Sequence, residues 1–354
     1  MKICYFGSYP LYYPRHQIIT KGLQGQGVDI VQVQDNSSIL IRYPKLLNKY
    51  LCADDYDALL VGEASNYVMP LAVLLKKLFK KPIIFDTFVS VYDTNLDRRT
   101  YNSPIVSKSL FWLDKFNCEN SDVVLQGTEQ DIFYFNQTFG IDIEKFQRLF
   151  IGADNDIFYP RETQRIANDD TFTVLFYGTY IPLHGIEYII KAAKLLESHT
   201  DIKFQLIGSG QTLMDIENLC LSLKLNNVEF IKQFVEYGTL PSYISAASVG
   251  LGIFGGTTKA NRVIPTKAFQ IIAMKKPLIT GNSPAAQEIF VNNENAILCN
   301  MADPRSLADA ILQLKEDESL RNTVASNGFK TYQQRLTPSI IGLEMKNILD
   351  RLCL

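Results

Sequence analysis

The chain has 354 residues, of which 47% are apolar and 20% are charged, so it has enough length and apolar content for two domains with sizeable cores. Its 35 basic and 37 acidic side chains leave a formal charge of −2, which gives no argument for general nucleic-acid binding. No apolar run approaches the roughly eighteen residues of a transmembrane helix, and the N-terminus reads as a strand and not as a signal peptide. Six scattered cysteines and three histidines indicate neither a disulfide framework nor a zinc site, and predict a cytoplasmic protein with reduced thiols.

The first half of the chain alternates short apolar runs with longer amphipathic stretches. Because these apolar runs are continuous, they are typical of parallel strands that helices cover on both faces. Strands are predicted at residues 2–6, 28–33, 57–62, 81–86 and 122–127. Helices are predicted at residues 15–26, 67–80, 105–118 and 129–138.

The alternation stops at residues 152–170, a polar stretch with a proline and no apolar period, and then starts again. Strands are predicted at residues 172–177, 202–208, 228–231, 248–254, 277–280 and 296–299. Helices are predicted at residues 186–198, 212–223, 266–275, 285–291, 304–315 and 317–333. The pattern predicts two α/β sandwiches with a ligand cleft between them.

We therefore expect two domains at residues 1–155 and 172–335, joined by a linker at 156–171. The remaining residues, 336–354, carry apolar side chains on one helical stripe. That helix either closes the second domain or reaches back to the first, and spacing alone leaves both open.

The segment "KANRVIPTKAFQ" (259–270) contains the most specific signal. Pro265 presets φ for a helical first turn and Thr266 can cap it, so a helix is predicted to begin there. Lys267 and Gln270, three residues apart, would then project from the same side. The helix follows a predicted strand directly, which places its positive N-terminal end at the carboxyl edge of the sheet.

Lys259 and Arg262 precede this helix and can converge with Lys267 on one anion. A diphosphate fits three cations at a helix N-terminus, with Gln270 left to bind a hydroxyl or a base edge. The alternative is a solvated loop with capping residues. The position between strand and helix favours the phosphate.

The turn "YGTYIPLHG" (177–185) links the first strand of the second half to its first helix, another place where backbone N–H groups meet phosphate or sugar. His184 lies near the helix start, where a cation is disfavoured, so it could reach a ligand as a neutral donor or be an ordinary turn residue. The stretch "LIGSGQ" (206–211) lacks the third glycine of a dinucleotide loop and is interpreted as a tight turn.

In the first half, "FGSYPLYYPRHQ" (6–17) follows the first strand. Gly7 and Ser8 permit a ligand to approach the backbone, and Tyr9 offers an amphipathic surface for a sugar or lipid. Packing between domains is an equal explanation for the tyrosine.

Three carboxylates end strands or begin loops in the first half. Asp86 closes a buried strand, where a carboxylate is costly unless it is paired or functional. It could orient an acceptor hydroxyl or take its proton. Asp93 in the following loop and Glu63 after the preceding strand are weaker candidates, and helix capping or a turn hydrogen bond is the alternative role.

Four segments of the second half together resemble the donor-binding half of GT-B glycosyltransferases of the group 1, family 4 type. They are "VLFYGTYIPLHGIEYIIKAAKLL", "FQLIGSGQ", "LPSYISAASVGLGIF" and "RVIPTKAFQIIAMKKPLITGNSPAAQEI". In the first half "YPRHQIITKGL", "PIIFDTFVSVYDT" and "GADNDIF" resemble the acceptor domain of a bacterial branch of that family. The resemblance implies the GT-B architecture of two Rossmann-like αβα domains, a nucleotide-sugar bound to the C-terminal one, and a final helix that crosses back to the first.

The same resemblance assigns roles by position. Gln270 corresponds to the second glutamate of the family's E-x7-E motif and Arg262 to the first, while Tyr180 and His184 replace the usual Arg and Lys of the first donor-domain loop. Catalytic roles are expected for Asp86, Arg262 and Lys267. Donor-side contacts are expected from Gly178, Thr179, Tyr180, His184, Lys259, Pro265, Thr266 and Gln270. Acceptor-side contacts are expected from Gly7, Ser8, Tyr9, Arg15 and Asp93.

The predicted function is a retaining hexosyl transfer from a nucleoside-diphosphate sugar to a glycan or lipid-linked hydroxyl, in the biosynthesis of a surface polysaccharide. No metal or other cofactor and no nucleic acid is expected, and the protein would work in the cytoplasm, at the inner face of the membrane if it makes peripheral contact there. The alternatives are a non-catalytic glycosyltransferase-like binding subunit and a GT-B sugar-nucleotide 2-epimerase. A two-domain dehydrogenase lacks support because no complete GxGxxG follows a strand.

Overall fold

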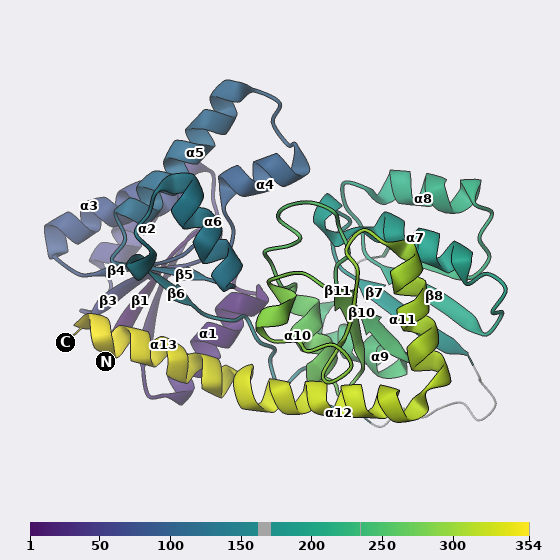
Figure 1. Ribbon diagram of the computed structural model, residues 1–354. Coiled ribbons are helices and arrows are strands. Elements are labelled where there is room, and N and C mark those ends of the chain that lie inside the picture. Colours follow the sequence, from purple (N-terminus) through teal and green to yellow (C-terminus); the bar gives the residue numbers. More distant parts are fainter. Residues whose placement is uncertain (162–170, 234, 354) are drawn as a thin grey trace. The chain divides into compact units, whose positions relative to one another are not determined.

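The computed structural model describes residues 1–161, 171–233 and 235–353, which fall into two compact units (Figure 1). The first unit holds residues 1–152 and 337–354, and the second holds residues 153–336. Each unit has one parallel six-stranded sheet, so the predicted α/β fold with two Rossmann-like domains is confirmed. Of the linker predicted at 156–171, residues 162–170 lie outside the described part of the chain.

The sheet of the first unit has the strand order β2-β1-β3-β4-β5-β6. Its strands are β1 (Lys2–Gly7), β2 (Asp29–Gln34), β3 (Ala58–Val61), β4 (Ile83–Asp86), β5 (Val123–Gln126) and β6 (Phe146–Arg148). The central strands β3 and β4 are buried at every position, as their continuous apolar sequences predict. Helices of this unit are α1 (Pro14–Gly25), α2 (Ile39–Leu51), α3 (Met69–Phe79), α4 (Val91–Arg98), α5 (Pro104–Glu119), α6 (Glu129–Phe139) and α13 (Pro338–Cys353).

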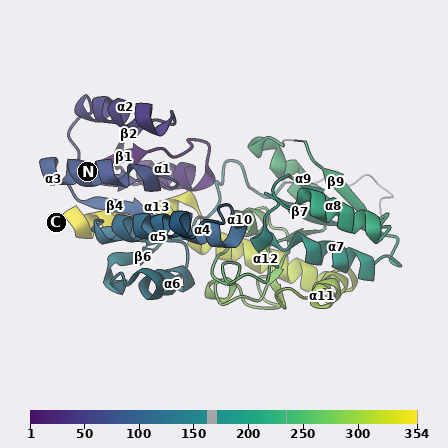
Figure 2. The same cartoon turned by 90° about the horizontal axis from the view of Figure 1, so that it is seen from above.

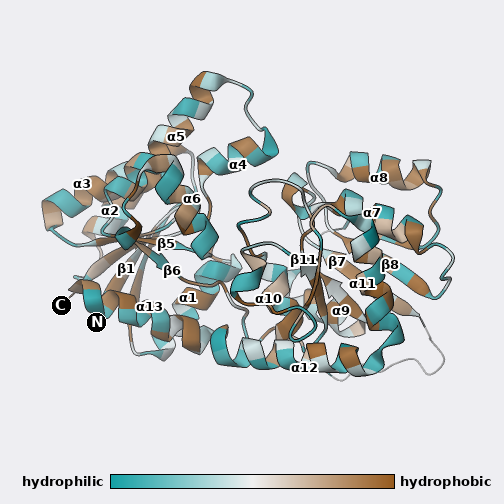
Figure 3. Ribbon diagram, in the orientation of Figure 1, coloured by the Kyte–Doolittle hydropathy of each residue, from teal (hydrophilic) through white to brown (hydrophobic). Residues whose placement is uncertain are grey.

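The sheet of the second unit has the strand order β12-β11-β10-β7-β8-β9. Its strands are β7 (Phe172–Tyr177), β8 (Ile202–Ile207), β9 (Val228–Ile231), β10 (Val249–Leu251), β11 (Leu278–Gly281) and β12 (Ile297–Cys299). Helices of this unit are α7 (Ile186–Leu195), α8 (Leu213–Ser222), α9 (Leu240–Ala246), α10 (Thr266–Ala273), α11 (Pro304–Glu316) and α12 (Glu318–Arg335). Figure 3 shows the apolar colour concentrated on the strands and on the helix faces that cover them.

Several elements differ from the sequence prediction. Helix α2 was not expected, because Pro44 lies inside it and removes a backbone donor. The helix predicted at 285–291 is only a 3₁₀ turn at Ala286–Glu288. The short strand β6 and the short helices α4 and α9 carry too few apolar residues to give a period of their own.

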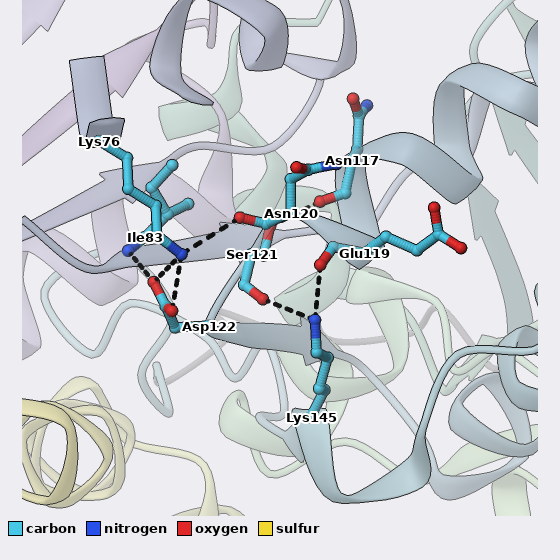
Figure 4. Close-up of polar contacts among 8 residues, drawn as sticks. All are labelled: Lys76, Ile83, Asn117, Glu119, Asn120, Ser121, Asp122 and Lys145. Atoms are coloured by element: carbon cyan, nitrogen blue, oxygen red, sulfur yellow. Dashed lines mark hydrogen bonds and ion pairs between the residues drawn. The ribbon is translucent and has the colours of Figure 1, made fainter. Parts of the chain in front are cut away.

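Partly buried and exposed polar contacts link the start of β4 to the end of α5 (Figure 4). Asp122, just before β5, accepts from Lys76 Nζ at 2.7 Å and from the Ile83 backbone N–H at 2.7 Å. Lys145 donates to the carbonyl oxygens of Glu119 and Ser121 at 2.6 and 3.1 Å. These bonds satisfy backbone groups that the sheet leaves open where two parallel strands begin.

The final helix α13 packs against α1 in the first unit at a contact between two glycines. A Cβ on Gly342 would lie 2.1 Å from the carbonyl carbon of Gly22, and one on Gly22 would lie 2.2 Å from the carbonyl oxygen of Pro338. The helix backbones therefore touch where neither residue has a side chain. Beside this contact Gln26 donates to the Ser339 carbonyl at 3.2 Å.

We predict that Gly342→Ala destabilises the protein by about 2 kcal/mol or more, since the added methyl forces two backbones apart. Gly25→Ala is the matched control, because nothing lies within 4 Å of a Cβ at that helical position. It should be neutral or stabilising by up to about 1 kcal/mol through helix propensity. Urea denaturation of both variants measures the difference, and equal stabilities would show that α1 and α13 separate without cost.

Candidate functional site

The candidate site of the second unit lies at the carboxyl ends of β7 and β10, which are neighbours in the sheet. Strands β8 and β9 lie on the far side of β7, while β11 and β12 lie on the far side of β10. The order in which the chain adds strands to the sheet therefore reverses between β7 and β10. At such a point the loops after the two strands diverge and leave room for a ligand.

Lys267 is placed at this point by the start of α10. Pro265 precedes the helix in an extended conformation, with φ −74° and ψ 145°, and Thr266 and Lys267 form the first turn. The Lys267 side chain is only 5% exposed, its Nζ lies 3.8 Å from the centre of the Phe176 ring, and no described residue accepts a hydrogen bond from it. Burial lowers the pKa of this amine well below its ordinary value.

Gly178 has no side chain, so it leaves open the space toward which the Lys267 amine points. Its φ is +142°, and a Cβ there would lie 3.0 Å from Lys267 Nζ and 3.5 Å from Cε1 of His184. The structure thus brings together residues that the sequence predicted from two separate motifs: Gly178 and His184 from one, and Lys267 from the other. His184 Nδ1 lies 2.5 Å from the carbonyl oxygen of Thr179, so that nitrogen carries the proton and the ring orientation is held by the backbone.

The glycines of "LIGSG" have a role that the interpretation as a plain tight turn missed. A Cβ on Gly208 would lie 2.0 Å from the carbonyl oxygen of Gly178, and one on Gly210 would lie 2.6 Å from the carbonyl oxygen of Tyr180. The turn after β8 therefore lies directly against the turn after β7, and the Tyr180 N–H donates to the Ser209 carbonyl at 2.9 Å. The glycine spacing in "GSG" was the available signal.

Two of the predicted donor-side residues, Tyr180 and Gln270, have side chains that are buried against other residues of the second unit. Tyr180 is fully buried in the core of the second unit, with its ring edge toward Phe176, so only its backbone faces the turn. Gln270 is 3% exposed, accepts from the Tyr177 hydroxyl at 3.0 Å and donates to the Tyr237 hydroxyl at 3.1 Å. A role for Tyr237 was missed, because 33 residues separate it from Gln270 and only packing joins them.

Arg262 and Lys259 lie on the turn that precedes α10. The Arg262 backbone N–H donates to the Lys259 carbonyl at 3.0 Å, and its Nε donates to the Thr258 carbonyl at 3.2 Å. Both residues have further interactions within the chain. Neither donates to or accepts from Lys267 Nζ, so the predicted cluster of three cations remains a prediction.

The candidate site of the first unit lies where β1 and β3 are neighbours, the corresponding reversal in that sheet. Arg15, at the start of α1, is fully buried; its Nε donates to Asp86 Oδ2 at 2.7 Å and its Nη1 to the Leu149 carbonyl at 2.9 Å. Asp86 is equally buried, and its other oxygen accepts from the Phe88 N–H at 3.3 Å. Asp86, which the sequence analysis assigned to proton transfer, is thus engaged in an ion pair with Arg15. Its role in proton transfer remains a prediction.

Glu63 is the carboxyl group of this region without such a pairing. It follows β3, is 1% exposed, and neither oxygen has a hydrogen-bond partner among the described residues. Burial, and then the negative charge of Asp86, raise the pKa of Glu63 well above its usual range, while Arg15 and the His16 backbone N–H oppose that rise. The protonated form of Glu63 is therefore favoured more than it is in an exposed glutamate.

Aromatic residues surround Glu63 and carry further polar atoms. The Tyr5 hydroxyl and His16 Nδ1 are buried without a partner among the described residues, and burial lowers the pKa of His16 to about 4. Tyr9, predicted as an acceptor surface, is instead buried: its ring stacks on His16 at 4.6 Å and its hydroxyl donates to the Tyr5 carbonyl at 2.9 Å. The predicted surface role is wrong for the Tyr9 side chain, because its ring is buried in the core.

The remaining acceptor-side residues serve local structure. A Cβ on Gly7 would collide with the Ser65 side chain, and the Ser8 N–H donates to Ser65 Oγ at 2.9 Å. This contact joins the loops after β1 and β3. Asp93 lies in the first turn of α4, where its backbone N–H donates to Ser90 Oγ at 2.9 Å. Ser90 is therefore the residue that caps this helix, and the role of the Asp93 carboxylate remains a prediction.

Residues 161–331 match the family described as glycosyl transferases group 1. This match covers just under half of the chain, and over that stretch the chain is similar to the group 1 glycosyltransferases.

Among its relatives, an uncharacterized glycosyltransferase of Methanocaldococcus jannaschii is 29% identical over 161 residues, or 44% of this chain and 41% of its own length. The capsular polysaccharide biosynthesis glycosyltransferase CapM of Staphylococcus aureus is 28% identical over 222 residues, or 60% of this chain and 53% of its own length. The alignments thus span about half the length of these curated relatives.

Solved structures with a similar fold cover nearly the whole chain. Sucrose-phosphate synthase from Thermosynechococcus elongatus superposes with a TM-score of 0.79 at 17% identity and covers 99% of both chains. HepE from Anabaena, in complex with UDP, gives a TM-score of 0.76 at 14% identity over 99% of this chain and all of its own. Both agree with the GT-B architecture that the resemblance implied.

Across residues 1–161, 171–233 and 235–353, no helix is both long enough and apolar enough to cross a membrane. Within the same described ranges, no three His, Cys, Asp or Glu side chains lie together as a metal would require.

We predict that Glu63→Gln becomes more stable than wild type as the pH rises. The folded-state pKa lies above the unfolded value of about 4.3, so the wild type loses stability as the pH climbs toward that pKa. The amide resembles the neutral acid and has no such loss. The two proteins should be similar near pH 4 and differ by about 1 kcal/mol or more at pH 8.

Urea denaturation at both pH values measures this difference, with the exposed Glu316→Gln as control. The control should keep a constant offset from wild type. A constant offset for Glu63→Gln as well would mean that Glu63 titrates like an exposed carboxylate.

Proposed function

We propose that this protein is a glycosyltransferase that moves a hexose from a nucleoside diphosphate to an acceptor hydroxyl, with retention at the anomeric carbon and without a metal. The observation that supports this most directly is the unpartnered Lys267 amine, buried between Phe176 and Gly178 at the direction change of the second sheet. A buried amine without a partner costs free energy in the empty protein. An anion bound at this point would remove that cost.

The chemistry needs a positive charge at this position. The anomeric C–O bond of the donor breaks, its electron pair goes to the diphosphate, and the acceptor oxygen forms the new bond to carbon. The acceptor proton leaves to a leaving-group oxygen or to a carboxylate of the first unit. A protonated Lys267, together with the first N–H groups of α10, stabilises the charge that develops on the diphosphate.

The Lys267 amine also indicates the class of donor. A diphosphate beside Lys267 restores the proton that burial disfavours, so donor binding takes up a proton in this proposal. The crystal structures of HepE in complex with UDP and with UDP-glucose support a uridine nucleotide sugar as the first donor to test. The name of CapM supports an acceptor in capsular or related surface polysaccharide synthesis, where a glycan or lipid-linked hydroxyl is the acceptor class.

We predict that Lys267→Met raises the melting temperature of the ligand-free protein and abolishes its response to UDP. Methionine keeps the length of the side chain and removes a buried unsatisfied donor, which is worth about 1–3 kcal/mol. Saturating UDP at about 100 times its dissociation constant should stabilise wild type by about 2.7 kcal/mol and the variant by nothing. Thermal-shift titrations with UDP, GDP, dTDP and CMP make the measurement.

Lys203→Met is the matched control, since Lys203 is exposed on β8 in the same unit. It should keep the full nucleotide response. Binding of UDP to Lys267→Met with unchanged affinity would overturn the assignment of the diphosphate site.

A non-catalytic binding subunit is the second candidate function. It is favoured by one observation: the positions that the resemblance matches to the two glutamates of E-x7-E hold Arg262, which is bonded to the Thr258 carbonyl, and Gln270, which is held by two tyrosines. Neither is a carboxylate that could attend the donor sugar. A 2-epimerase would need acidic residues at the same place, and Arg262 disfavours it.

Slow hydrolysis of UDP-glucose without an acceptor separates these functions. We predict that wild type releases UDP, with water replacing the acceptor, and that Lys267→Met lowers the rate by a factor of about 100 or more. Released UDP and glucose are followed by ion-exchange chromatography, using other nucleotide sugars if thermal shifts favour them. Tight nucleotide binding with no hydrolysis and no transfer would establish the binding subunit instead.

A further inference from the structure

Two buried carboxyl groups lie at the same edge of the first sheet. Asp86 is the last residue of β4, and Glu63 follows the end of β3. Because β3 and β4 are parallel neighbours, their carboxyl ends lie side by side. Asp86 is fully buried and Glu63 is 1% exposed. Two carboxyl groups in this position repel each other when both are charged, so their surroundings decide which of them carries a proton.

The surroundings of the two carboxyl groups are opposite in kind. Asp86 accepts from Arg15 Nε at 2.7 Å and from the Phe88 backbone N–H at 3.3 Å, so its charge is compensated. Neither oxygen of Glu63 has a hydrogen-bond partner among the described residues. Where the surroundings of two neighbouring carboxyl groups differ in this way, the paired group stays charged and the unpaired group exchanges the proton.

Other polar atoms near Glu63 also lack partners. The Tyr5 hydroxyl, Arg15 Nη2 and His16 Nδ1 are buried without a hydrogen bond to any described residue. The Tyr5 and His16 rings lie 4.5 Å apart, and Figure 2 shows α1, which carries His16, beside β1. We call Tyr5, Arg15, His16 and Glu63 the Glu63 cluster. Because it contains both donors and acceptors, a hydroxyl group is the ligand that would satisfy it.

The Glu63 cluster lies close to the surface of the first unit. Tyr13, in the loop between β1 and α1, is half-buried. Burial, and then the charge of Glu63, raise the pKa of Tyr13 to about 12, which places its hydroxyl near Glu63. Leu11 and Tyr12 of the same loop are 48% and 77% exposed. Local opening at residues that bury so little surface costs little free energy, and it would admit an acceptor to the cluster.

From these contacts we infer that Glu63, and not Asp86, takes the proton of the acceptor hydroxyl, an inference that rests on the proposed transferase function. The acceptor O–H bond breaks, its proton goes to a Glu63 carboxylate oxygen, and the electron pair of the acceptor oxygen forms the bond to the anomeric carbon. The C–O bond to the diphosphate breaks at the same carbon and leaves its electron pair on the diphosphate. The Tyr5 hydroxyl and Arg15 Nη2 hold the acceptor oxygen, and Glu63 returns its proton to water after the product leaves.

The pH dependence of turnover reports on Glu63. The other titratable and charged groups that face it from β1, the following loop, α1 and β4 are Tyr5, Tyr13, Arg15, His16 and Asp86. Burial raises the pKa of Tyr5 well above its usual range and lowers the pKa of His16 to about 4, while Arg15 and Asp86 form the ion pair. The pKa of Glu63 is raised from its ordinary acidic value, so its loss of a proton with rising pH should increase the rate.

The test follows the hydrolysis of UDP-glucose between pH 5 and pH 9, with water in place of the acceptor. In wild type, kcat should rise with pH and level off above the pKa of Glu63. Glu63→Gln should lower the plateau by a factor of about 100 and remove the rise, with KM for UDP-glucose unchanged. Glu63→Asp should recover part of the rate together with the rise. Tyr5→Phe should lower kcat about tenfold and keep the rise, because it removes one hydrogen bond to the acceptor oxygen.

Asp35→Asn is the matched control. Asp35 follows β2 at the same edge of the sheet and is 8% exposed, but its carboxylate accepts from Ser37 and pairs with Lys49 at 3.6 Å. This variant should keep both the plateau and the rise of wild type. Every variant should also be stabilised by UDP to the same extent as wild type, which shows that the donor side remains folded.

Two results for Glu63→Gln would overturn the inference. A wild-type rate would show that Glu63 takes no part in turnover, and a lower rate that still rises with pH would show that another group accepts the proton. Either result leaves the transferase proposal standing, because wild type still turns over. Absence of hydrolysis in wild type with every nucleotide sugar would instead overturn the transferase proposal, and this inference with it.

Discussion

The unpartnered amine of Lys267 is the constraint around which the second unit is arranged. An amine buried to this degree raises the free energy of the empty protein, and no described residue accepts a hydrogen bond from it. Gly178 leaves open the space in front of the amine, Phe176 lies behind it, and the turn after β8 presses against the turn that contains Gly178. The fold thus holds the amine in position before a ligand binds, which is electrostatic preorganisation.

The first unit shows the same arrangement with the opposite chemistry. Its candidate site also lies where the sheet changes direction, beside the first strand and its neighbour β3. Here the opposite charges of Arg15 and Asp86 form an ion pair, and the group without a hydrogen-bond partner is the Glu63 carboxyl, whose pKa is raised by burial. A carboxyl group in its protonated form can both donate and accept, which suits a hydroxyl compound, whereas the second unit presents an amine that suits phosphate. This difference fits an acceptor on one unit and a donor on the other.

The sequence by itself determined the alternation of buried strands and helices, the start of α10 at Thr266 after Pro265, and the family resemblance. These follow from local rules: continuous apolar runs, proline geometry and glycine at turns. Only the tertiary structure decided which side chains are available. Tyr9 and Tyr180 enter the core, Gln270 is held by two tyrosines, and Asp86 pairs with Arg15 from 71 residues away. Burial and pairing depend on residues far apart in the chain, so a local pattern can locate a site but cannot show which of its groups remain without a partner.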